Sequence, residues 1–268
     1  MDWRDQLAKN YRRVDLAEEE FKDLTREIRE AVAAERLTLD YEIAPDRLSY
    51  SAKLVVGSAP EVDRWAHKAG NIIHNLRSSL DNLIETLGEA PGSQAPSRPN
   101  MVHFPVAKTR GEWRDERRRV SHLKALYFNR IRDVQPFNRI EDGKGLQNDG
   151  LLLLSVLDNQ SKHRLQLEAE IQLSSIDFDF AVKYENDAEA SKSVPPDIEI
   201  RKVPFKTGEV VMIHRGGGRI ERLIGSNKMM FDLCLVHGTE TYRLAEIVSN
   251  LGQYTRVLMD YVVDGKAS

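Results

Sequence analysis

The sequence has little cysteine. Cys234 is the only one among 268 residues, so no disulfide can form within the chain. Proteins without disulfides are typical of reducing compartments, and we expect a cytoplasmic location. Cys234 lies in the apolar run 229–236, which favours a buried core thiol over a reactive nucleophile. The first residues, with Asp2, Arg4 and Asp5 and no apolar stretch behind them, do not have the pattern of a signal peptide.

Long apolar runs and the common cofactor motifs are also missing. No stretch approaches the ~20 apolar residues of a membrane-spanning helix, so we expect no membrane association. The sequence contains no Walker A motif, no G-x-G-x-x-G after a strand and no G-x-S-x-G. Its seven histidines show neither H-x-x-x-H nor H-E-x-x-H spacing, so the sequence predicts no metal site and no cofactor. The glycines at 216–218 join two strand-like runs and predict a hairpin turn rather than a phosphate loop.

The charge balance excludes a global attraction to nucleic acid. The formal net charge is −3, so an anionic partner would have to be recruited by a local cationic patch. Hydrophobic residues make up 41% and charged residues 30% of the chain, which is typical of a folded globular protein. The length allows one large domain or two small ones.

Apolar residues recur every three or four positions in several stretches, which is the spacing of amphipathic helices. The first predicted helix would be about 50 Å long at 1.5 Å per residue, and its apolar stripe is interrupted only at Asn10. The second has the strongest pattern and opens on a capping box from Ser58 to Glu61. The predicted helices cover residues 2–36, 58–87, 109–134 with a break near Ser121, 151–162 and 239–263.

Alternating apolar and polar residues predict strands in two parts of the chain. Residues 39–54 form a predicted hairpin around the turn Ala44-Pro45-Asp46. After Arg164 the period is two again, with strands expected at 165–173, 176–182, 197–203, 209–214, 219–224 and 229–236.

These patterns predict an α+β fold, in which a helical bundle layer of the long N-terminal, central and C-terminal helices packs on an antiparallel meander sheet. Residues 1–164 would be mainly helical with an early β-hairpin. Residues 165–268 would supply the sheet and the C-terminal helix of one continuous domain. The long N-terminal helix could also join copies of the chain into a homo-oligomer.

The second predicted helix carries the first candidate site. His74, Arg77 and Asp81 share one surface of this helix, away from its apolar stripe. An arginine that stabilises phosphoryl charge and a histidine that moves a proton are what metal-independent phosphodiester chemistry requires. The alternative is a solvated polar face with an i,i+4 ion pair between Arg77 and Asp81.

The second candidate cluster runs from Asp158 to Arg164, where a buried helix leads into the first strand of the sheet half, and it ends in Lys162, His163 and Arg164. Three consecutive residues of this kind cannot all be buried, so they could form an anion site. The alternative is a helix C-terminus at which cations complement the helix dipole.

The third candidate is the cationic segment, residues 108–132. It holds nine cationic and three acidic side chains, a net charge of +6, with Trp113, Tyr127 and Phe128 interleaved. Cations and aromatic residues in one stretch are typical of nucleic-acid contacts, here centred on Arg117, Arg118 and Arg119. An exposed helix face that offsets acidic residues elsewhere is the alternative.

The order of these motifs resembles a widespread family of uncharacterised bacterial proteins. The resemblance rests on H-N-L-R-S-S-L-D at 74–81, Phe104-Pro105, Gln135-Pro136-Phe137 and the Lys162–Arg164 junction, and it covers roughly the first 170 residues. A more distant analogy is with HEPN-type ribonucleases, in which an arginine precedes a histidine by four to six residues. Asn82 stands where that histidine would be, so His74 or His163 would have to supply the proton shuttle.

Two hypotheses of function follow. The first is a protein that handles RNA or another phosphate-bearing ligand, in its sharpest form a metal-independent HEPN-like ribonuclease with His74, Arg77, Asp81 and His163 as catalytic residues. The second is a non-catalytic binding or assembly protein, in which the same residues form a structural polar network. We predict that His74, Arg77 and Asp81 lie close to Lys162, His163 and Arg164. The two most apolar helices should be neighbours in the core, and charged groups at their shared edge must pair or be hydrated.

Overall fold

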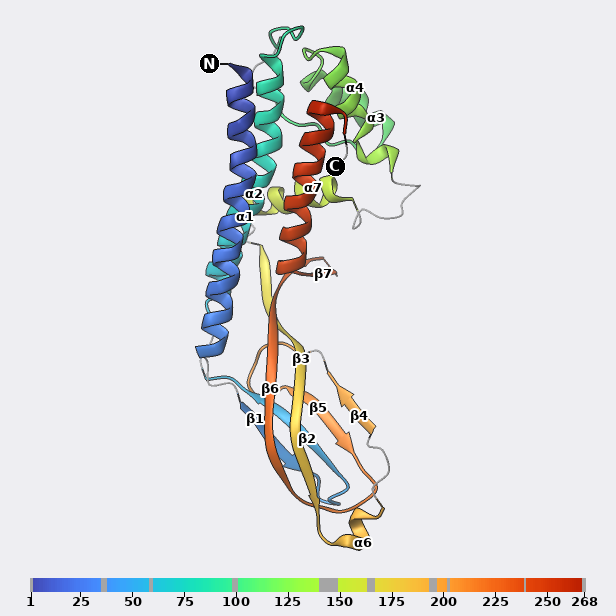
Figure 1. The fold of residues 1–268 in the computed structure, drawn as a ribbon. Helices are drawn as coiled ribbons and strands as arrows, with labels where there is room; N and C mark the ends of the chain where they lie inside the picture. The colour runs from blue at the N-terminus through green and yellow to red at the C-terminus, as the bar shows by residue number, and fades with distance from the viewer. Residues whose placement is uncertain are drawn as a thin grey trace. The chain divides into compact units, whose positions relative to one another are not determined.

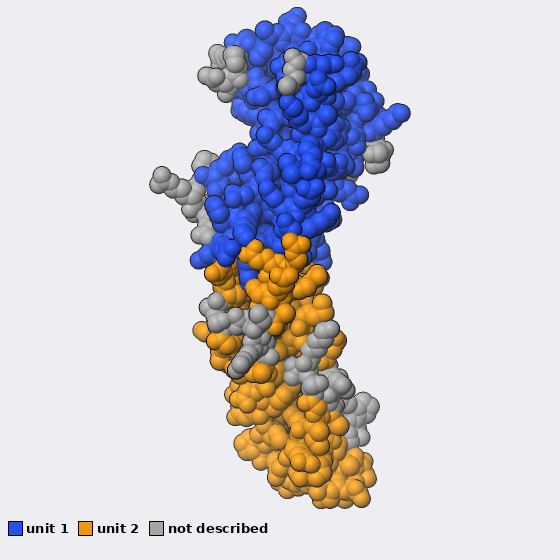
Figure 2. Space-filling model, turned by 60° about the vertical axis from the view of Figure 1, so that its left-hand side comes forward, with its two compact units in different colours: residues 1–25, 63–168, 245–268 blue, residues 26–62, 169–244 orange. Residues whose placement is uncertain are grey.

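The protein, described here from a computed structural model, is divided by its internal contacts into two compact units (Figure 2). The helical unit comprises residues 1–25, 63–168 and 245–268, and the sheet unit comprises residues 26–62 and 169–244. The predicted α+β class is confirmed, because long helices pack together and the strands form antiparallel sheets. The structure describes residues 2–34, 38–57, 60–97, 101–139, 149–162, 167–192, 197–201, 203–238 and 240–266.

Three long helices supply the core of the helical unit: α1 (Trp3–Ala34), which belongs to this unit up to Thr25, α2 (Val62–Gly88) and α7 (Leu244–Asp264). They lie side by side (Figure 1). The 32 residues of α1 include no proline or glycine, so nothing in its sequence interrupts the helix. The apolar stripe of α2 is buried along its whole length, from Trp65 to Leu87.

The helix contacts include polar pairs that the apolar patterns do not reveal. Asn10, which interrupts the stripe of α1, is buried and donates from Nδ2 to Thr86 Oγ1 of α2 at 2.9 Å. Tyr11 donates to Asp260 of α7 at 2.6 Å, and Arg256 of α7 donates to Asp15 at 2.6 Å. At the polar gap in the apolar stripe of α1, a buried hydrogen bond from Asn10 therefore joins α1 to α2.

The helical unit also contains shorter helices: α3 (Arg110–Glu116), the 3₁₀ turn η2 (Arg117–Arg119), α4 (Ala125–Asp133), the 3₁₀ turn η3 (Pro136–Asn138) and α5 (Gly150–Lys162). The predicted break near Ser121 is confirmed. Thr109 caps α3 by accepting from Glu112 N, and Asp149 caps α5 by accepting from the N–H groups of Leu151 and Leu152.

The strands of the sheet unit form two antiparallel sheets. In the first, of strand order β1-β2-β5-β4, β1 (Thr38–Ile43) and β2 (Ser49–Val55) form the predicted hairpin. It continues through β5 (Val210–Arg215) to β4 (Asp197–Ile200), so the pairing is not sequential along the chain. The second sheet has the order β3-β6-β7, with β3 (Glu168–Tyr184), β6 (Ile220–His237) and β7 (Glu240–Arg243).

Several predicted boundaries in the sheet unit are wrong. β3 and β6 are single long strands where the sequence predicts two each, and β7 occupies the predicted start of the last helix. The glycines at 216–218 do not close a hairpin, because β5 and β6 belong to different sheets. A Cβ at Gly218 would lie 2.1 Å from the Glu189 carbonyl oxygen of the short helix α6 (Asp187–Ala190), so this link requires glycine for a close backbone approach.

Both sheets contribute to one apolar core. Tyr50, Ala52 and Leu54 of β2 pack with Leu173 and Ile176 of β3. Met212 of β5 and Ile220 of β6 belong to the same buried cluster. Cys234 is buried in β6, as the apolar run around it predicts.

Candidate functional site

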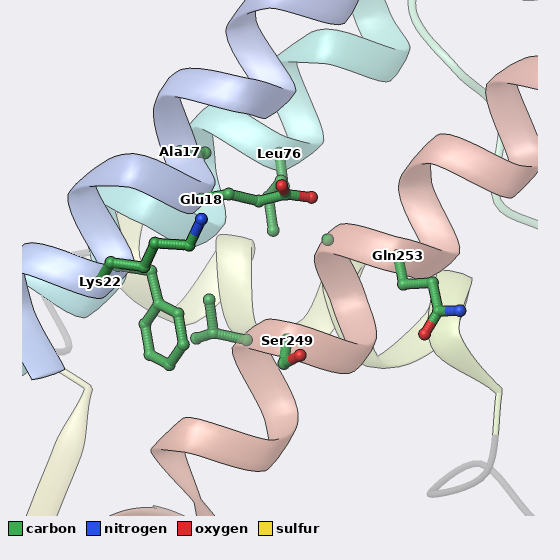
Figure 3. Close-up of a pocket in the computed structure, with 9 residues that line it drawn as sticks. Ala17, Glu18, Lys22, Leu76, Ser249 and Gln253 are labelled. Atoms are coloured by element: carbon green, nitrogen blue, oxygen red, sulfur yellow. The ribbon is translucent and has the colours of Figure 1, made fainter.

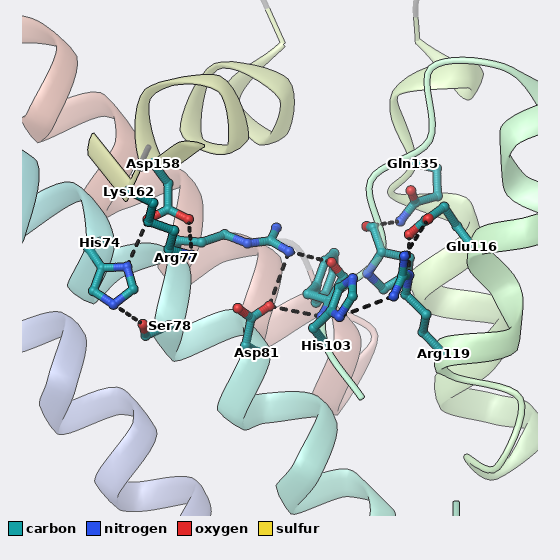
Figure 4. Close-up of polar contacts among 12 residues, drawn as sticks. His74, Arg77, Ser78, Asp81, His103, Glu116, Arg119, Gln135, Asp158 and Lys162 are labelled. Carbon is teal, nitrogen blue, oxygen red and sulfur yellow. Dashed lines mark hydrogen bonds and ion pairs between the residues drawn. The ribbon is translucent and has the colours of Figure 1, made fainter. Parts of the chain in front are cut away.

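The polar face of α2 holds an extended segment of the helical unit. Arg77 Nη2 donates to the Phe104 carbonyl, and Asp81 Oδ1 accepts from the Phe104 N–H at 2.9 Å (Figure 4). Arg77 and Asp81 also form an ion pair of 3.1 Å. Arg77 is 7% exposed and Phe104 is fully buried. We call this arrangement the Phe104 clasp, and it satisfies both backbone polar groups of a buried residue that lies outside the helices.

Asp158 of α5 connects the two predicted clusters. Its buried carboxylate contacts His74 Nδ1 at 2.8 Å through Oδ1 and Lys162 Nζ at 2.6 Å through Oδ2 (Figure 4). The His74 side chain is 45% exposed, and its Nε2 lies 3.3 Å from Ser78 Oγ. The predicted approach of the clusters is therefore confirmed for His74 and Lys162. His163 and Arg164 lie outside the described residues.

The segment that follows His103 is also held from its other side. Gln135, which is fully buried, donates to the Pro105 carbonyl at 3.1 Å and accepts from the Ala107 N–H at 2.9 Å. Arg119 Nη1 lies 3.4 Å from His103 Nδ1. Burial and then the nearby Arg119 guanidinium lower the pKa of His103 below its ordinary value. Residues 103–107 are thus fixed between α2 on one side and Arg119 and Gln135 on the other.

These contacts correct one expectation about Arg77. The helical pattern leaves Arg77 free to meet an anion, but its guanidinium is buried and donates to a backbone carbonyl beside its own carboxylate partner. Sequence reasoning also missed Gln135 and the central role of Asp158. The i,i+4 spacing of Asp158 and Lys162 was the available signal for Asp158. The sequence also predicted that the cluster of His74 approaches Lys162, but not that the Asp158 carboxylate joins them.

The cationic segment divides into structural and exposed cations. Arg119 forms two contacts with the Glu116 carboxylate, at 2.7 and 3.0 Å. Arg130 donates to the carbonyls of Val262 and Val263 near the end of α7, where a cation complements the helix dipole. Arg118 is only loosely paired, 3.8 Å from Asp115, and its side chain is 78% exposed. The other exposed cations of the stretch are Lys108, Arg110, Arg114, Arg117, Lys124 and Arg132.

The aromatic residues of this segment contribute mainly to the interior. Trp113 and Tyr127 are buried, and the Trp113 ring packs against Phe128 and Phe137 at centroid distances of 5.7 and 6.2 Å. Arg110 lies over the Phe137 ring, 5.8 Å from its centroid. Trp113 and Tyr127 are therefore unable to stack on nucleic-acid bases without leaving the core.

A hollow between α1 and α7 offers a different environment (Figure 3). Glu18 and Lys22 of α1 and Ser249 and Gln253 of α7 line it, together with apolar residues that include Leu76. Its two charged side chains have opposite signs, and Glu18 also lies 3.4 Å from Arg256. This hollow therefore combines one acidic and one basic side chain with apolar lining residues.

Among the described residues, no group of three or more His, Cys, Asp or Glu side chains could hold a metal ion. Within the same stretches of chain, none of the helices combines the length and the apolar character that crossing a membrane requires.

Comparison of the chain with protein-family models, curated proteins and solved structures finds no match in any of the three. Membership of the bacterial family that the motifs resemble therefore stays a prediction.

Proposed function

We propose that this protein binds nucleic acid through the phosphate backbone, using the exposed cations of the cationic segment, and that the Phe104 clasp is structural. The observation that supports binding is the exposure of Arg114, Arg117 and Arg118 on consecutive turns of α3 and η2. Arginines three and four positions apart lie on neighbouring parts of a helix surface. Together with Lys108 and Lys124 they concentrate positive charge in a chain whose net charge is negative.

The same stretch supports contacts to phosphates rather than to bases. Trp113 and Tyr127 are buried, which removes two of its three aromatic residues as stacking platforms. Phosphate contacts position a protein on a nucleic acid and carry no sequence information. We therefore infer binding with little sequence preference and a strong dependence on salt.

A structural role for the clasp follows from what Arg77 contacts. A guanidinium that stabilises a transition state must reach the reacting phosphoryl group. Arg77 instead donates to the Phe104 carbonyl and pairs with Asp81 inside the helical unit. The clasp thereby fixes the segment that leads into α3, which carries the exposed arginines.

The test is the salt dependence of binding to a labelled single-stranded RNA, measured by fluorescence anisotropy. The triple variant Arg114→Glu, Arg117→Glu, Arg118→Glu should lower affinity at least tenfold. Loss of three phosphate contacts should also reduce the slope of log K against log salt by about 2. Arg119 is left unchanged, because it holds Glu116.

A matched control reverses three exposed cations on α1, in the variant Arg12→Glu, Arg13→Glu, Lys22→Glu. It changes the net charge by the same amount and should bind RNA with nearly the affinity and slope of the unmodified protein. Absence of binding at low salt, or equal losses in both triple variants, would refute the proposal.

A metal-independent ribonuclease is a second candidate, and one observation favours it. His74 is half exposed, and its Nδ1 is held by the buried Asp158 carboxylate, as a general base is often oriented by a carboxylate. In this case His74→Ala should abolish RNA cleavage while the melting temperature changes little. Cleavage that is absent from the unmodified protein, or that persists in His74→Ala, would refute it.

A further inference from the structure

A hollow lies beside the exposed arginines, bounded by the end of α3, by η2 and by the stretches 96–97, 101–102 and 121–122. Its volume is about 420 Å³, within the range of roughly 300–1,000 Å³ that is typical of small-ligand sites. Arg118 and Arg119 line it from η2, and His122 lines it from the following turn.

His122 is the unusual group in this hollow. Its side chain is polar and only 8% exposed, yet within the described residues its ring has no hydrogen-bonding partner. The ring passes so close to Gly88 that a Cβ there would lie 3.2 Å from His122 Nε2. Burial lowers the pKa of His122, so near neutral pH its imidazole is uncharged and can both donate and accept a hydrogen bond. A buried imidazole without a partner indicates a ligand or water in the hollow.

The walls of the hollow combine three kinds of group. Pro96, Met101 and Val102 form an apolar side, whereas Arg118 and Arg119 supply positive charge. The carboxylates of Asp115 and Glu116 also line it. Glu116 is bonded to Arg119 through both oxygens, but Asp115 and Arg118 are 3.8 Å apart and highly exposed. A pair so weakly held in solvent leaves Arg118 available to an anion.

These groups together match a nucleotide. A phosphate needs cationic and neutral donors, a base can lie on an apolar wall, and ribose hydroxyls or a base amino group need acceptors such as carboxylates. Under the proposed function, phosphates inside a strand contact the exposed surface of the cationic segment rather than this hollow. A hollow of this size, lined by Arg118 and by the largely buried His122, suits a single nucleotide that carries its own phosphate.

We propose that this hollow binds a nucleoside monophosphate, with the phosphate monoester between Arg118 and His122 and the base against Met101 and Val102. The nucleotide could be free or could be the phosphorylated end of a strand that lies along the cationic segment. In the second case the site rests on the proposed function, because the strand must first be bound there.

The experiment compares four probes with the full-length protein: AMP, adenosine, and one RNA oligonucleotide with and without a 5′-phosphate. We expect AMP to bind at least tenfold more tightly than adenosine by calorimetry. Ser97→Asp places a negative charge on an exposed lining position and should weaken AMP binding tenfold or more. Ser249→Asp, an equivalent exposed change in the hollow between α1 and α7, should have no effect.

His122→Gln tests whether the His122 imidazole contacts the phosphate. If this variant fails to fold, Ser97→Asp still tests the proposed site. A strand-end site predicts that the 5′-phosphate raises RNA affinity and that Ser97→Asp removes this gain. A free-nucleotide site predicts AMP binding without that gain. Equal binding of AMP and adenosine together with equal binding of the two RNAs would overturn this inference. If both RNAs nevertheless bind with a steep salt dependence, the nucleotide site is refuted but the proposed binding of nucleic acid is not.

Discussion

Replacement of Arg77 by methionine tests whether the Phe104 clasp holds the helical unit together. Methionine fills most of the same space without the guanidinium. The change leaves the buried Phe104 carbonyl without its donor, which costs about 1–3 kcal/mol. Asp81 also loses its cation, but its side chain is 30% exposed and can be hydrated, so this loss adds only about 1 kcal/mol. We expect Arg77→Met to lower the free energy of unfolding by about 2–4 kcal/mol.

The assay is urea unfolding followed by tryptophan fluorescence. The three tryptophans, Trp3, Trp65 and Trp113, all belong to the helical unit, so their emission reports on the part of the protein that contains the clasp. Arg118→Met is the matched control. Its side chain is 78% exposed and only loosely paired, so its stability should stay within about 0.5 kcal/mol of the unmodified protein.

A double-mutant cycle separates the clasp from a general effect of losing an arginine. Asp81→Asn keeps an oxygen that can accept from the Phe104 N–H but leaves Arg77 buried without its counter-ion. The double variant should therefore be less destabilised than the sum of the two single changes, by about 1 kcal/mol or more. Additive effects, or an Arg77→Met protein as stable as the control, would refute the clasp as a stabilising element.

The helices of the helical unit could be predicted because their signals are local. The stripe from Trp65 to Leu87 needs only the helical period, and the boundary at Thr109 needs only a capping side chain. The contacts at Arg77 have a different origin. The sequence placed Arg77 on the helix surface that carries His74 and Asp81, but its partner is a backbone carbonyl 27 residues away. Local spacing contains no information about which extended segment will cross a helix.

The contacts of Asp158 also show what local spacing cannot predict. Its pairing with Lys162 follows from i,i+4 spacing within one helix, whereas its contact with His74 depends on how α5 meets α2. The sequence therefore predicted that the clusters approach one another without predicting which carboxylate joins them.

Strand boundaries failed for a related reason. The apolar alternation of β3 is interrupted at Ser174 and Ser175, and that of β6 at Gly225, which has a positive φ of 138°. Both interruptions resemble turns when considered locally. In the sheet unit the chain continues through them because β3 and β6 are neighbours in one sheet, where each strand supplies backbone hydrogen-bond partners to the other. Pairing partners, rather than the local pattern, decide where these strands end.

Three further predictions address packing and pH dependence. Gly150→Ala should cost about 1–3 kcal/mol in the urea assay, because a Cβ there would lie 2.8–3.0 Å from three carbons of the Tyr254 ring. Asn10→Ala should cost about 1–2 kcal/mol in the same assay, since it removes the buried donor to Thr86. His214→Phe should make the stability of the sheet unit less sensitive to acid, as thermal unfolding followed by circular dichroism at several pH values would show.

The sign of this last effect follows from burial of His214. The ring is 5% exposed and stacks on Tyr50 at a centroid distance of 4.7 Å, and burial lowers its pKa. In the unfolded state its pKa is near 6.5, so the unfolded chain binds a proton that the folded protein resists. Stability should therefore be insensitive to this ring above that value and should fall as pH decreases below it, by up to about 1.4 kcal/mol per pH unit. Phenylalanine keeps the stacking and cannot take up the proton. Any pH-independent cost of the substitution cancels when the stability of each protein at pH 7.5 is compared with its stability at pH 5.5. If stability falls equally with pH in both proteins, protonation of His214 is not what opposes folding in acid.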